Sequence, residues 1–313
     1  MKLTSPADIE RAEARIRPFI RRTPVMDYAV DVTLKLEYLQ HGGSFKPRGA
    51  FNALLSQPIP RAGVAAASGG NHGIAVALAA KAQEVPATIF VPDIAAPAKI
   101  AAIRAAGADI RIGGARYSDA LAACDSFIAE SGAVSIHAYD SAATIAGQGT
   151  VALEWDTQSD AGLDTVLVAV GGGGLIAGMA AWWRGSVRVI GVEPQGSCAL
   201  HAALAAGVPI DVEVNSIAAD SLGAKRVGVQ PFAIAQQWVE AVALVPDAAI
   251  AAAQLKLWAD LRIATEPGGA TALAALLSGA YRPAAGERVG VLVCGANVDL
   301  AALASTAAGV VTG

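Results

Sequence analysis

The sequence is short of charged residues and of cysteine. Only 16% of its 313 residues are charged, and 23 basic against 27 acidic side chains give a net charge of −4 with no basic stripe. This balance does not favour a nucleic-acid partner. The three cysteines form no CxxC or CxxH spacing, so neither a zinc site nor a disulfide framework is expected. Unpaired cysteines and the lack of a signal-peptide pattern predict a cytoplasmic protein.

A mean hydropathy of +0.47 raises the question of a membrane span. The strongest candidate is residues 165–183, TVLVAVGGGGLIAGMAAWW, which carry no charge. Four consecutive glycines stand in the middle, and each disfavours a helix by about 1 kcal/mol relative to alanine. The stretch therefore predicts a buried strand over Val166–Val170, a glycine loop and the start of a helix, with no membrane partner.

Short apolar runs alternate with alanine-rich segments of helical spacing along most of the chain. The runs predict strands, and the near-continuous apolar ones are typical of parallel strands covered on both faces. The predicted strands are 63–68, 87–92, 109–113, 133–138, 165–170, 187–194 and 288–295. We therefore expect an α/β chain with two parallel sheets in three-layer domains. Ligands of such sheets bind beyond the carboxyl ends of the strands, so the loops that follow them are the candidate sites.

The tetraglycine loop Gly171–Gly174 follows a predicted strand and opens a predicted helix. Free N–H groups and the helix dipole at such a position favour a phosphate, although a tight turn would give the same pattern. No Gly-Lys-Ser/Thr follows, so the loop is not a P-loop. It also lacks the GxGxxG spacing of a dinucleotide site, although Glu193 lies near the acidic position of that motif. A nucleotide site therefore remains an alternative.

Two further loops carry polar groups after predicted strands. SGGNHG (68–73) offers Asn71 and backbone amides to a carboxylate or phenolic oxygen, or simply caps a helix with asparagine. VLVCGANVD (291–299) ends a buried strand at Cys294, which is either a ligand contact or a buried structural thiol.

The stretch HGGSFKPRGAF (41–51) places Lys46 among glycines, an aromatic ring and a proline. A lysine in apolar surroundings has a lowered pKa and can act as a Schiff-base nucleophile, whereas an ordinary lysine is solvated. Together the four loops offer an amine for an aldehyde, a cradle for a phosphate, and partners for a ring oxygen and a ring nitrogen. Pyridoxal phosphate has all four groups.

These motifs resemble those of the serine/threonine dehydratases, pyridoxal-phosphate enzymes of the tryptophan-synthase-β fold (fold type II). The resemblance runs from about residue 5 to residue 305. The motifs that carry it are SFKPRGA (44–50), SGGNHG, IAGQGT (145–150), GGGGL (171–175), GVEP (191–194), DSLGAKRVG (220–228), EPGGA (266–270) and CGANVD (294–299).

The resemblance implies a large cofactor-binding domain, residues 1–49 plus 144–313, and a small inserted domain, residues 50–143. It implies that Lys46 holds the cofactor through its amine, with Phe45 against the ring. Asn71 would bond the 3′-oxygen and the four glycines the phosphate. Cys294 would face the pyridine nitrogen, where a neutral thiol does not keep the ring protonated and so suits elimination better than transamination.

The implied reaction is β-elimination of water from a small 3-hydroxy-amino acid of the L-threonine or L-serine type. Lys46 would remove the Cα proton, the β-hydroxyl would leave, and the product would become a 2-oxo acid and ammonia. The candidate substrate contacts are Ser68, Gly69, Asn71, His72 and Tyr139. A homodimer is the family habit.

Two departures separate this chain from the serine racemases of the same fold. Racemases carry serine where this chain has Gly69, and an aspartate where it has Ala199. The resemblance therefore implies elimination, room at Gly69 for a bulkier substituent, and a monovalent-cation site, potassium-like, in place of a divalent one. The implied cation ligands are Glu193 and the carbonyls of Ser197, Ala199, Leu222 and Ala224. The alternatives are racemisation, β-replacement, and a non-catalytic binding protein on this fold.

Overall fold

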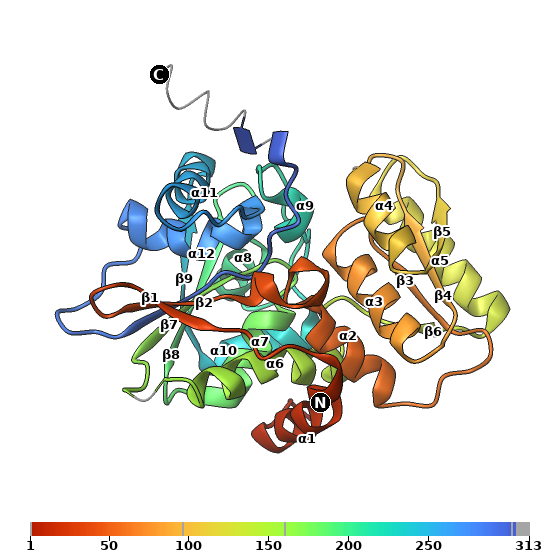
Figure 1. The fold of residues 1–313 in the computed structure, drawn as a ribbon, viewed down its shortest axis with the longest axis horizontal. Coiled ribbons are helices and arrows are strands. Elements are labelled where there is room, and N and C mark those ends of the chain that lie inside the picture. Colours follow the sequence, from red (N-terminus) through yellow and green to blue (C-terminus); the bar gives the residue numbers. More distant parts are fainter. Residues whose placement is uncertain (1, 96, 160, 302, 305–313) are drawn as a thin grey trace.

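Two β-sheets organise the chain in the computed structural model, which describes residues 2–95, 97–159, 161–301 and 303–304 (Figure 1). The first sheet has the strand order β1 (Val25–Ala29), β2 (Val32–Lys35), β10 (Val289–Leu292), β7 (Thr165–Ala169), β8 (Arg188–Pro194), β9 (Val239–Val245). The second has the order β5 (Asp109–Ile112), β4 (Ala87–Val91), β3 (Val64–Ala67), β6 (Val134–Ser135).

Helices cover both sheets. The six-stranded sheet and its helices form what we call the larger unit. Its helices are α1 (Pro6–Ile16), α2 (Lys46–Leu55), α6 (Ala142–Asp156), α7 (Gly174–Trp183), α8 (Ala199–Ala206), α9 (Ala219–Leu222), α10 (Val229–Trp238), α11 (Asp247–Leu261) and α12 (Pro267–Ser278). The four-stranded sheet and its helices form the smaller unit. Its helices are α3 (Asn71–Ala82), α4 (Pro97–Ala105) and α5 (Tyr117–Ser131). Short 3₁₀ turns lie at Arg17–Phe19, Glu37–Leu39 and His41–Gly43. In Figure 1, α11 and α12 lie above the first sheet and α6, α7 and α10 below it.

The four-stranded sheet lies between two helices. Along β3, Val64 and Ala66 pack into the core that α3 shares, whereas Ala65 and Ala67 pack into the core that α5 shares. Successive side chains of a strand point to opposite faces, so the two helices lie on opposite faces of the sheet. The predicted three-layer arrangement is therefore present in this unit.

All seven predicted strands form, but the first sheet is mixed rather than parallel. β1 pairs with β2 in antiparallel orientation, and the other neighbouring pairs of this sheet run parallel. The β1–β2 hairpin turns at Val30 and Asp31, where Asp31 takes the left-handed backbone conformation (φ 58°). A two-residue hairpin joins only antiparallel strands, and this pair was not predicted.

Both predicted domain boundaries fall inside helices. The first, after residue 49, lies within α2, and the second, after residue 143, lies in the first turn of α6. The four strands of the second sheet all lie between residues 64 and 135. The division into 1–49 plus 144–313 and 50–143 stays a prediction. Residues 1, 160, 302 and 305–313 of the larger part and residue 96 of the smaller part lie outside the described residues.

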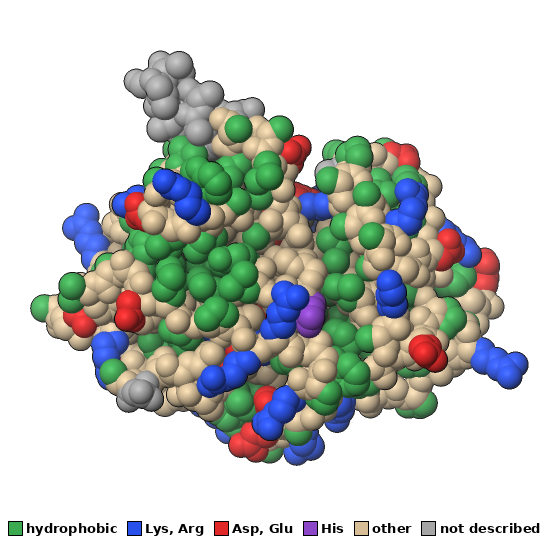
Figure 2. Space-filling view, in the orientation of Figure 1, with side chains coloured by type: hydrophobic (Ala, Val, Ile, Leu, Met, Phe, Trp, Pro, Cys, Tyr) green, Lys and Arg blue, Asp and Glu red, His purple; other side chains and the backbone are tan. Residues whose placement is uncertain are grey.

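The glycine-rich stretch 165–183 folds as predicted into a strand, a loop and a helix. β7 ends at Ala169 and α7 begins at Gly174. Among the helices of the described residues, none is long and apolar enough to cross a membrane. On the face seen in Figure 2, basic and acidic side chains are interspersed, and the surface is hollowed between the two units.

Candidate active site

Lys46 lines a cavity into which three of the predicted loops converge. The cavity wall contains Phe45, Lys46, Tyr139, Ala169, Val170, Gly171, Gly172, Gly173, Gly174, Leu175, Ile176, Ser221, Leu222 and Cys294. The lysine, the four glycines and the cysteine come from three segments that are more than 100 residues apart in the chain. Parallel strands end at one edge of a sheet, which brings the loops after β7 and β10 together.

The backbone beside Lys46 explains its position. Phe45 N–H donates to the carbonyl of Cys294 (3.2 Å), and Ser44 forms an isolated antiparallel bridge with Gly295. Lys46 then begins α2, with Pro47 in the first turn, where a missing N–H is tolerated. The stretch before α2 therefore runs along the end of β10, and Lys46 enters the cavity beside Cys294.

The Lys46 side chain is partly buried. Its Nζ donates to the carbonyl of Ala138 (3.2 Å) and lies 5.1 Å from the centroid of the Phe45 ring. Burial lowers the pKa of Lys46 to about 8, although Cys294 and Glu266 oppose this shift. At neutral pH a fraction of the amine is therefore unprotonated and able to act as a nucleophile or a base.

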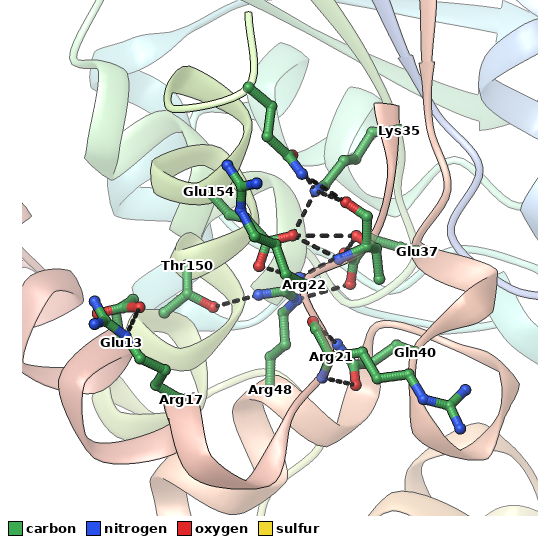
Figure 3. Close-up of polar contacts among 12 residues, drawn as sticks. Glu13, Arg17, Arg21, Arg22, Lys35, Glu37, Gln40, Arg48, Thr150 and Glu154 are labelled. Carbon is green, nitrogen blue, oxygen red and sulfur yellow. Dashed lines mark hydrogen bonds and ion pairs between the residues drawn. The ribbon is translucent and has the colours of Figure 1, made fainter. Parts of the chain in front are cut away.

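Lys46 stands on a helix anchored by a buried ion network (Figure 3). Two residues further on, the fully buried Arg48 donates to Glu37 through Nε (2.8 Å) and Nη2 (2.7 Å), and to Glu154 through Nη2 (3.0 Å). Lys35 in turn contacts Glu154 (2.5 Å). This network joins α2 to β2 and α6 and so fixes the start of the helix that carries Lys46.

Cys294 is held as a neutral thiol. Its Sγ donates to the carbonyl of Gly268 (3.4 Å), and burial raises the pKa of the thiol to about 12. A group with this pKa neither carries charge near neutral pH nor protonates a pyridine nitrogen. The electronic argument made from the sequence therefore has a physical cause in this site.

The tetraglycine loop lies against Tyr139. A Cβ at Gly172 would stand 2.2 Å from Cδ1 of Tyr139, and one at Gly174 would stand 2.8 Å from its Cα. Gly173 takes the left-handed conformation (φ 91°) just before α7. Glycine is thus required for the backbone to face the cavity, which is the geometry of a cradle for an anion.

Gly172→Ala is expected to weaken pyridoxal phosphate binding by at least about tenfold, because the added methyl displaces Tyr139 and narrows the cradle. Fluorescence titration of the cofactor measures the Kd. Gly113→Ala is the matched control, since a Cβ there meets nothing within 4 Å. Equal affinity in wild type and Gly172→Ala would contradict the assignment of this loop to the phosphate.

Asn71 lies outside the wall of that cavity but close to it. It begins α3, and its Nδ2 donates to Glu266 Oε1 (2.5 Å) while its Oδ1 accepts from Asn297 (2.7 Å). The same glutamate acts electrostatically on Lys46 and Cys294. Asn71 is thus joined to the lysine site through Glu266, a residue that the sequence analysis did not select although it opens the EPGGA motif.

The other residues of the asparagine loop differ in exposure and partners. Ser68 Oγ accepts from Gly70 N–H (3.2 Å). The ring of His72 is buried and bonds through Nε2 to the carbonyl of Ile136 (2.7 Å), and burial lowers its pKa to about 3. A contribution of His72 to a carboxylate site would therefore come from its backbone N–H.

The space beside Gly69 is occupied. A Cβ at Gly69 would stand 2.7 Å from the Cβ of Ala95 and 3.3 Å from Val91 Cγ1. A side chain at position 69 would therefore have no room in this direction, because the loop after β4 fills it, and the expectation that glycine leaves room for a bulkier substrate substituent stays a prediction. Sequence spacing could not reveal this contact, which is made between two segments of the tertiary structure.

Glu193 is buried near the end of β8, and its carboxylate contacts the start of α8. Its Oε1 accepts from Leu200 N–H (2.9 Å) and its Oε2 from His201 N–H (2.8 Å), and burial raises the pKa of Glu193 to about 7. Ser197 Oγ donates to the carbonyl of Leu222 (2.9 Å), one of the predicted cation ligands. The described residues contain no cluster of three or more His, Cys, Asp or Glu able to hold a metal. A cation held mainly by carbonyls stays a prediction.

The profile of the family described as "Pyridoxal-phosphate dependent enzyme" matches residues 16–295. The chain belongs to this family. Its α/β fold is accordingly the tryptophan-synthase-β-like fold expected from the motifs.

Relatives of this pyridoxal-phosphate enzyme include dehydratases and a racemase. Phenylserine dehydratase of Ralstonia pickettii is 37% identical over 305 residues, covering 93% of this chain and 92% of that protein. L-threonine ammonia-lyase of Geobacter sulfurreducens is 37% identical over 304 residues, covering 93% of this chain and 75% of that protein. The structure of maize serine racemase superposes with a TM-score of 0.91 at 34% identity over 99% of both chains.

The residues present fit pyridoxal phosphate. Lys46 offers a partly buried amine of lowered pKa, and the loop at Gly172 offers a backbone surface that a Cβ would obstruct. Cys294 offers a neutral partner in the same cavity wall. An aldehyde, a phosphate and a ring nitrogen would each meet a group of matching chemistry.

Proposed function

We propose that the protein is a pyridoxal-phosphate-dependent dehydratase, an ammonia-lyase that eliminates water from a small 3-hydroxy-amino acid to give a 2-oxo acid and ammonia. The observation that carries the proposal is the partly buried Lys46 amine of lowered pKa, which shares one cavity wall with the tetraglycine loop and a neutral Cys294. The relatives named as phenylserine dehydratase and L-threonine ammonia-lyase support the same reaction class.

The reaction needs a base next to the α-carbon of the substrate. Pyridoxal phosphate, when bound, withdraws electrons from that carbon and makes its proton acidic. Lys46 is the base, because its amine has a lowered pKa and lies over the Phe45 ring in the cavity wall. Cys294 stays a thiol in the working pH range and donates no charge or proton to the ring.

The substrate carboxylate needs donors on the side of the smaller unit. Ser68 and the N-terminus of α3 supply a hydroxyl and backbone N–H groups there. Tyr139 lies against the glycine loop and lines the cavity, and its ring stands perpendicular to that of His137, with centroids 4.8 Å apart. The segment after β6 therefore reaches the cavity wall. We propose that this segment receives the substrate side chain.

A substrate panel tests the proposal. We expect 2-oxo acid release from at least one of L-serine, D-serine, L-threonine, D-threonine, 3-hydroxyaspartate or β-phenylserine, measured by reduction of the oxo acid in a coupled assay. Lys46→Ala is the negative control, and release is expected to vanish in it. If no compound yields an oxo acid while D-serine accumulates from L-serine, the enzyme is a racemase and the dehydratase proposal fails.

Racemisation is the second candidate, favoured by the likeness to maize serine racemase. A racemase needs an acid on the second face of the substrate, and Gly69 supplies none. Gly69→Ser alone would crowd Ala95, so the test uses the double variant Gly69→Ser, Ala95→Gly. We expect it to release D-serine from L-serine at a measurable rate, whereas Ala95→Gly alone should not. An unchanged enantiomer ratio in the double variant would contradict the placement of position 69 beside the substrate.

Three finer points belong to the proposal. A monovalent cation such as K⁺ would bind near Glu193, Ser197 and Leu222, where buried oxygen atoms gather. The protein would act in the cytoplasm, since its three cysteines are free. It would form a homodimer, as members of this family do.

A further inference from the structure

Glu266 presents a buried carboxylate with one oxygen unused. The residue precedes α12 and is 3% exposed. Oε1 accepts from Asn71, whereas Oε2 has no hydrogen-bond partner among the described residues. A Cβ at Gly295 would stand 2.1 Å from Oε1, so only glycine beside Cys294 leaves space for the carboxylate. A buried carboxylate with an open oxygen is costly unless a cation faces it.

Lys99 supplies that cation from the smaller unit. It lies on α4, is 7% exposed, and places Nζ 3.9 Å from Glu266 Oε2. This distance is too long for a hydrogen bond, so the interaction is electrostatic. Lys99 also pairs with the exposed Asp220 on α9, and its Nζ lies 3.9 Å from where a Cβ of Gly70 would stand. The ammonium therefore sits between the asparagine loop and the larger unit.

The donors and acceptors of the hydrogen bonds around Asn71 can be assigned in only one way. The carbonyl of Gly42 only accepts, so the Asn297 atom 2.8 Å from it is the amide nitrogen. That same nitrogen donates to Asn71, which must present Oδ1 to it. The Asn71 nitrogen then donates one hydrogen to Glu266 and keeps its second hydrogen for another acceptor. Asn297 and Glu266 thus fix the orientation of the Asn71 amide from both ends.

The charges around Glu266 decide its protonation. Burial raises the pKa of Glu266, and Lys99, the Asn71 hydrogen bond and Lys46 oppose this shift. Burial lowers the pKa of Lys99, and Glu266 opposes it. Cys294 next to Gly295 is a neutral thiol, and Asp220 faces Lys99 rather than the carboxylate. Removal of Lys99 therefore leaves Lys46 as the cation that still acts on Glu266.

We propose that Glu266 and Lys99 are positioning residues of the active site. Glu266 holds Asn71 with one N–H donor free for the cofactor ring oxygen, and Lys99, brought in by the smaller unit, keeps Glu266 ionised. The orientation of Asn71 and the negative charge beside Lys46 then depend on an ion pair between the two units. The kinetic part of this inference rests on the proposed dehydratase function, whereas the spectroscopic part requires only a bound cofactor.

The test compares pH titrations of the loaded protein. Cofactor absorbance is recorded without substrate between about pH 5 and 8, where most proteins are most stable, and kcat/KM is recorded over the same range. In Lys99→Met, Glu266 loses the nearby positive charge that favours its ionised form, so its pKa should rise by about one unit. The midpoint of the acid-side absorbance change and the midpoint of the acid limb of kcat/KM should therefore both rise by about one pH unit. Lys99→Arg should restore the wild-type midpoints.

Two further variants make the outcome decisive. Lys81→Met removes an exposed lysine on α3 and should titrate like wild type. Glu266→Gln keeps the size of the side chain but removes its titration, so the acid-side change should disappear from the absorbance. The proposal is overturned if Lys99→Met and Lys81→Met titrate identically. It is also overturned if the acid-side absorbance change of the cofactor persists unchanged in Glu266→Gln. If Lys99→Met does not fold, Glu266→Gln decides alone.

Failure of the dehydratase proposal looks different. In that case the substrate panel releases no oxo acid, but the absorbance titrations of wild type, Lys99→Met and Glu266→Gln still differ as stated. Conversely, normal oxo acid release with identical titrations would retain the function and reject the role of Glu266 and Lys99.

Discussion

Lys46→Ala is expected to abolish the visible absorbance of pyridoxal phosphate on the protein and to lower turnover by at least about 10³-fold. The physical reason is that we propose the partly buried Lys46 amine as the nucleophile and base in the cavity wall, where Cys294 is a neutral thiol and the glycine loop carries no side chain. Absorbance after gel filtration and oxo acid release from the best substrate of the panel measure the two effects.

The control for this prediction is Lys81→Ala, which removes an exposed lysine and should leave both readings at the wild-type level. The pH dependence of cofactor loading gives an independent check. Since the free amine reacts with the aldehyde and the pKa of Lys46 is about 8, the loading rate should rise as pH increases through about 8. A colourless wild type after incubation with the cofactor, or a coloured and active Lys46→Ala protein, would reject the assignment.

Arg48→Leu is expected to lower the free energy of unfolding by about 3–5 kcal/mol. The leucine leaves the carboxylates of Glu37 and Glu154 without their guanidinium partner, in a region where Arg48 and Glu37 are both 0% exposed. Urea unfolding followed by circular dichroism measures the loss. Arg17→Leu is the matched control, because Arg17 pairs with Glu13 on the surface and should change stability little.

The same network predicts a direction for acid sensitivity. Burial opposes ionisation of Glu37, but the Arg48 guanidinium, together with Lys35 and the Thr23 hydroxyl, holds the pKa of this carboxyl below its ordinary value of 4.5. A group whose pKa is lower in the folded state contributes stability above that ordinary value, and the contribution is lost as pH falls through the folded pKa. Wild type should therefore lose stability on acidification below about pH 4.5 more steeply than Arg48→Leu. Equal stability of Arg48→Leu and Arg17→Leu would show that the network does not anchor α2.

The sequence selected several residues that the structure brings together, whereas it missed three of the strands. Lys46, Gly171–Gly174 and Cys294 were selected from loop chemistry, and the structure places all of them in one cavity wall. β1 and β2 were missed because they are short and mixed in polarity. β9 was missed because it starts directly after Trp238, the last residue of α10, without a glycine or proline to mark the change.

Residues that act through distant partners were beyond the reach of the sequence. Glu266 stood within a quoted motif, but its role depends on Asn71, 195 residues away, and on Lys99. Lys99 lies in an alanine-rich helical segment where an exposed lysine is the usual expectation. The contact of Gly69 with Ala95 was invisible for the same reason. Each is a contact between segments whose relative placement is set by packing.

The sequence by itself determined the chemistry of the loops and, through them, the family. Glycine runs, a lysine among apolar residues and apolar strand patterns are local signals, since they follow from the conformational freedom of single residues and from side-chain periodicity. Only the tertiary structure decided which charges are buried and paired. The pKa of Lys46, the neutral state of Cys294 and the pairing of Glu266 with Lys99 all arise from desolvation, and desolvation depends on what the folded chain places around each group.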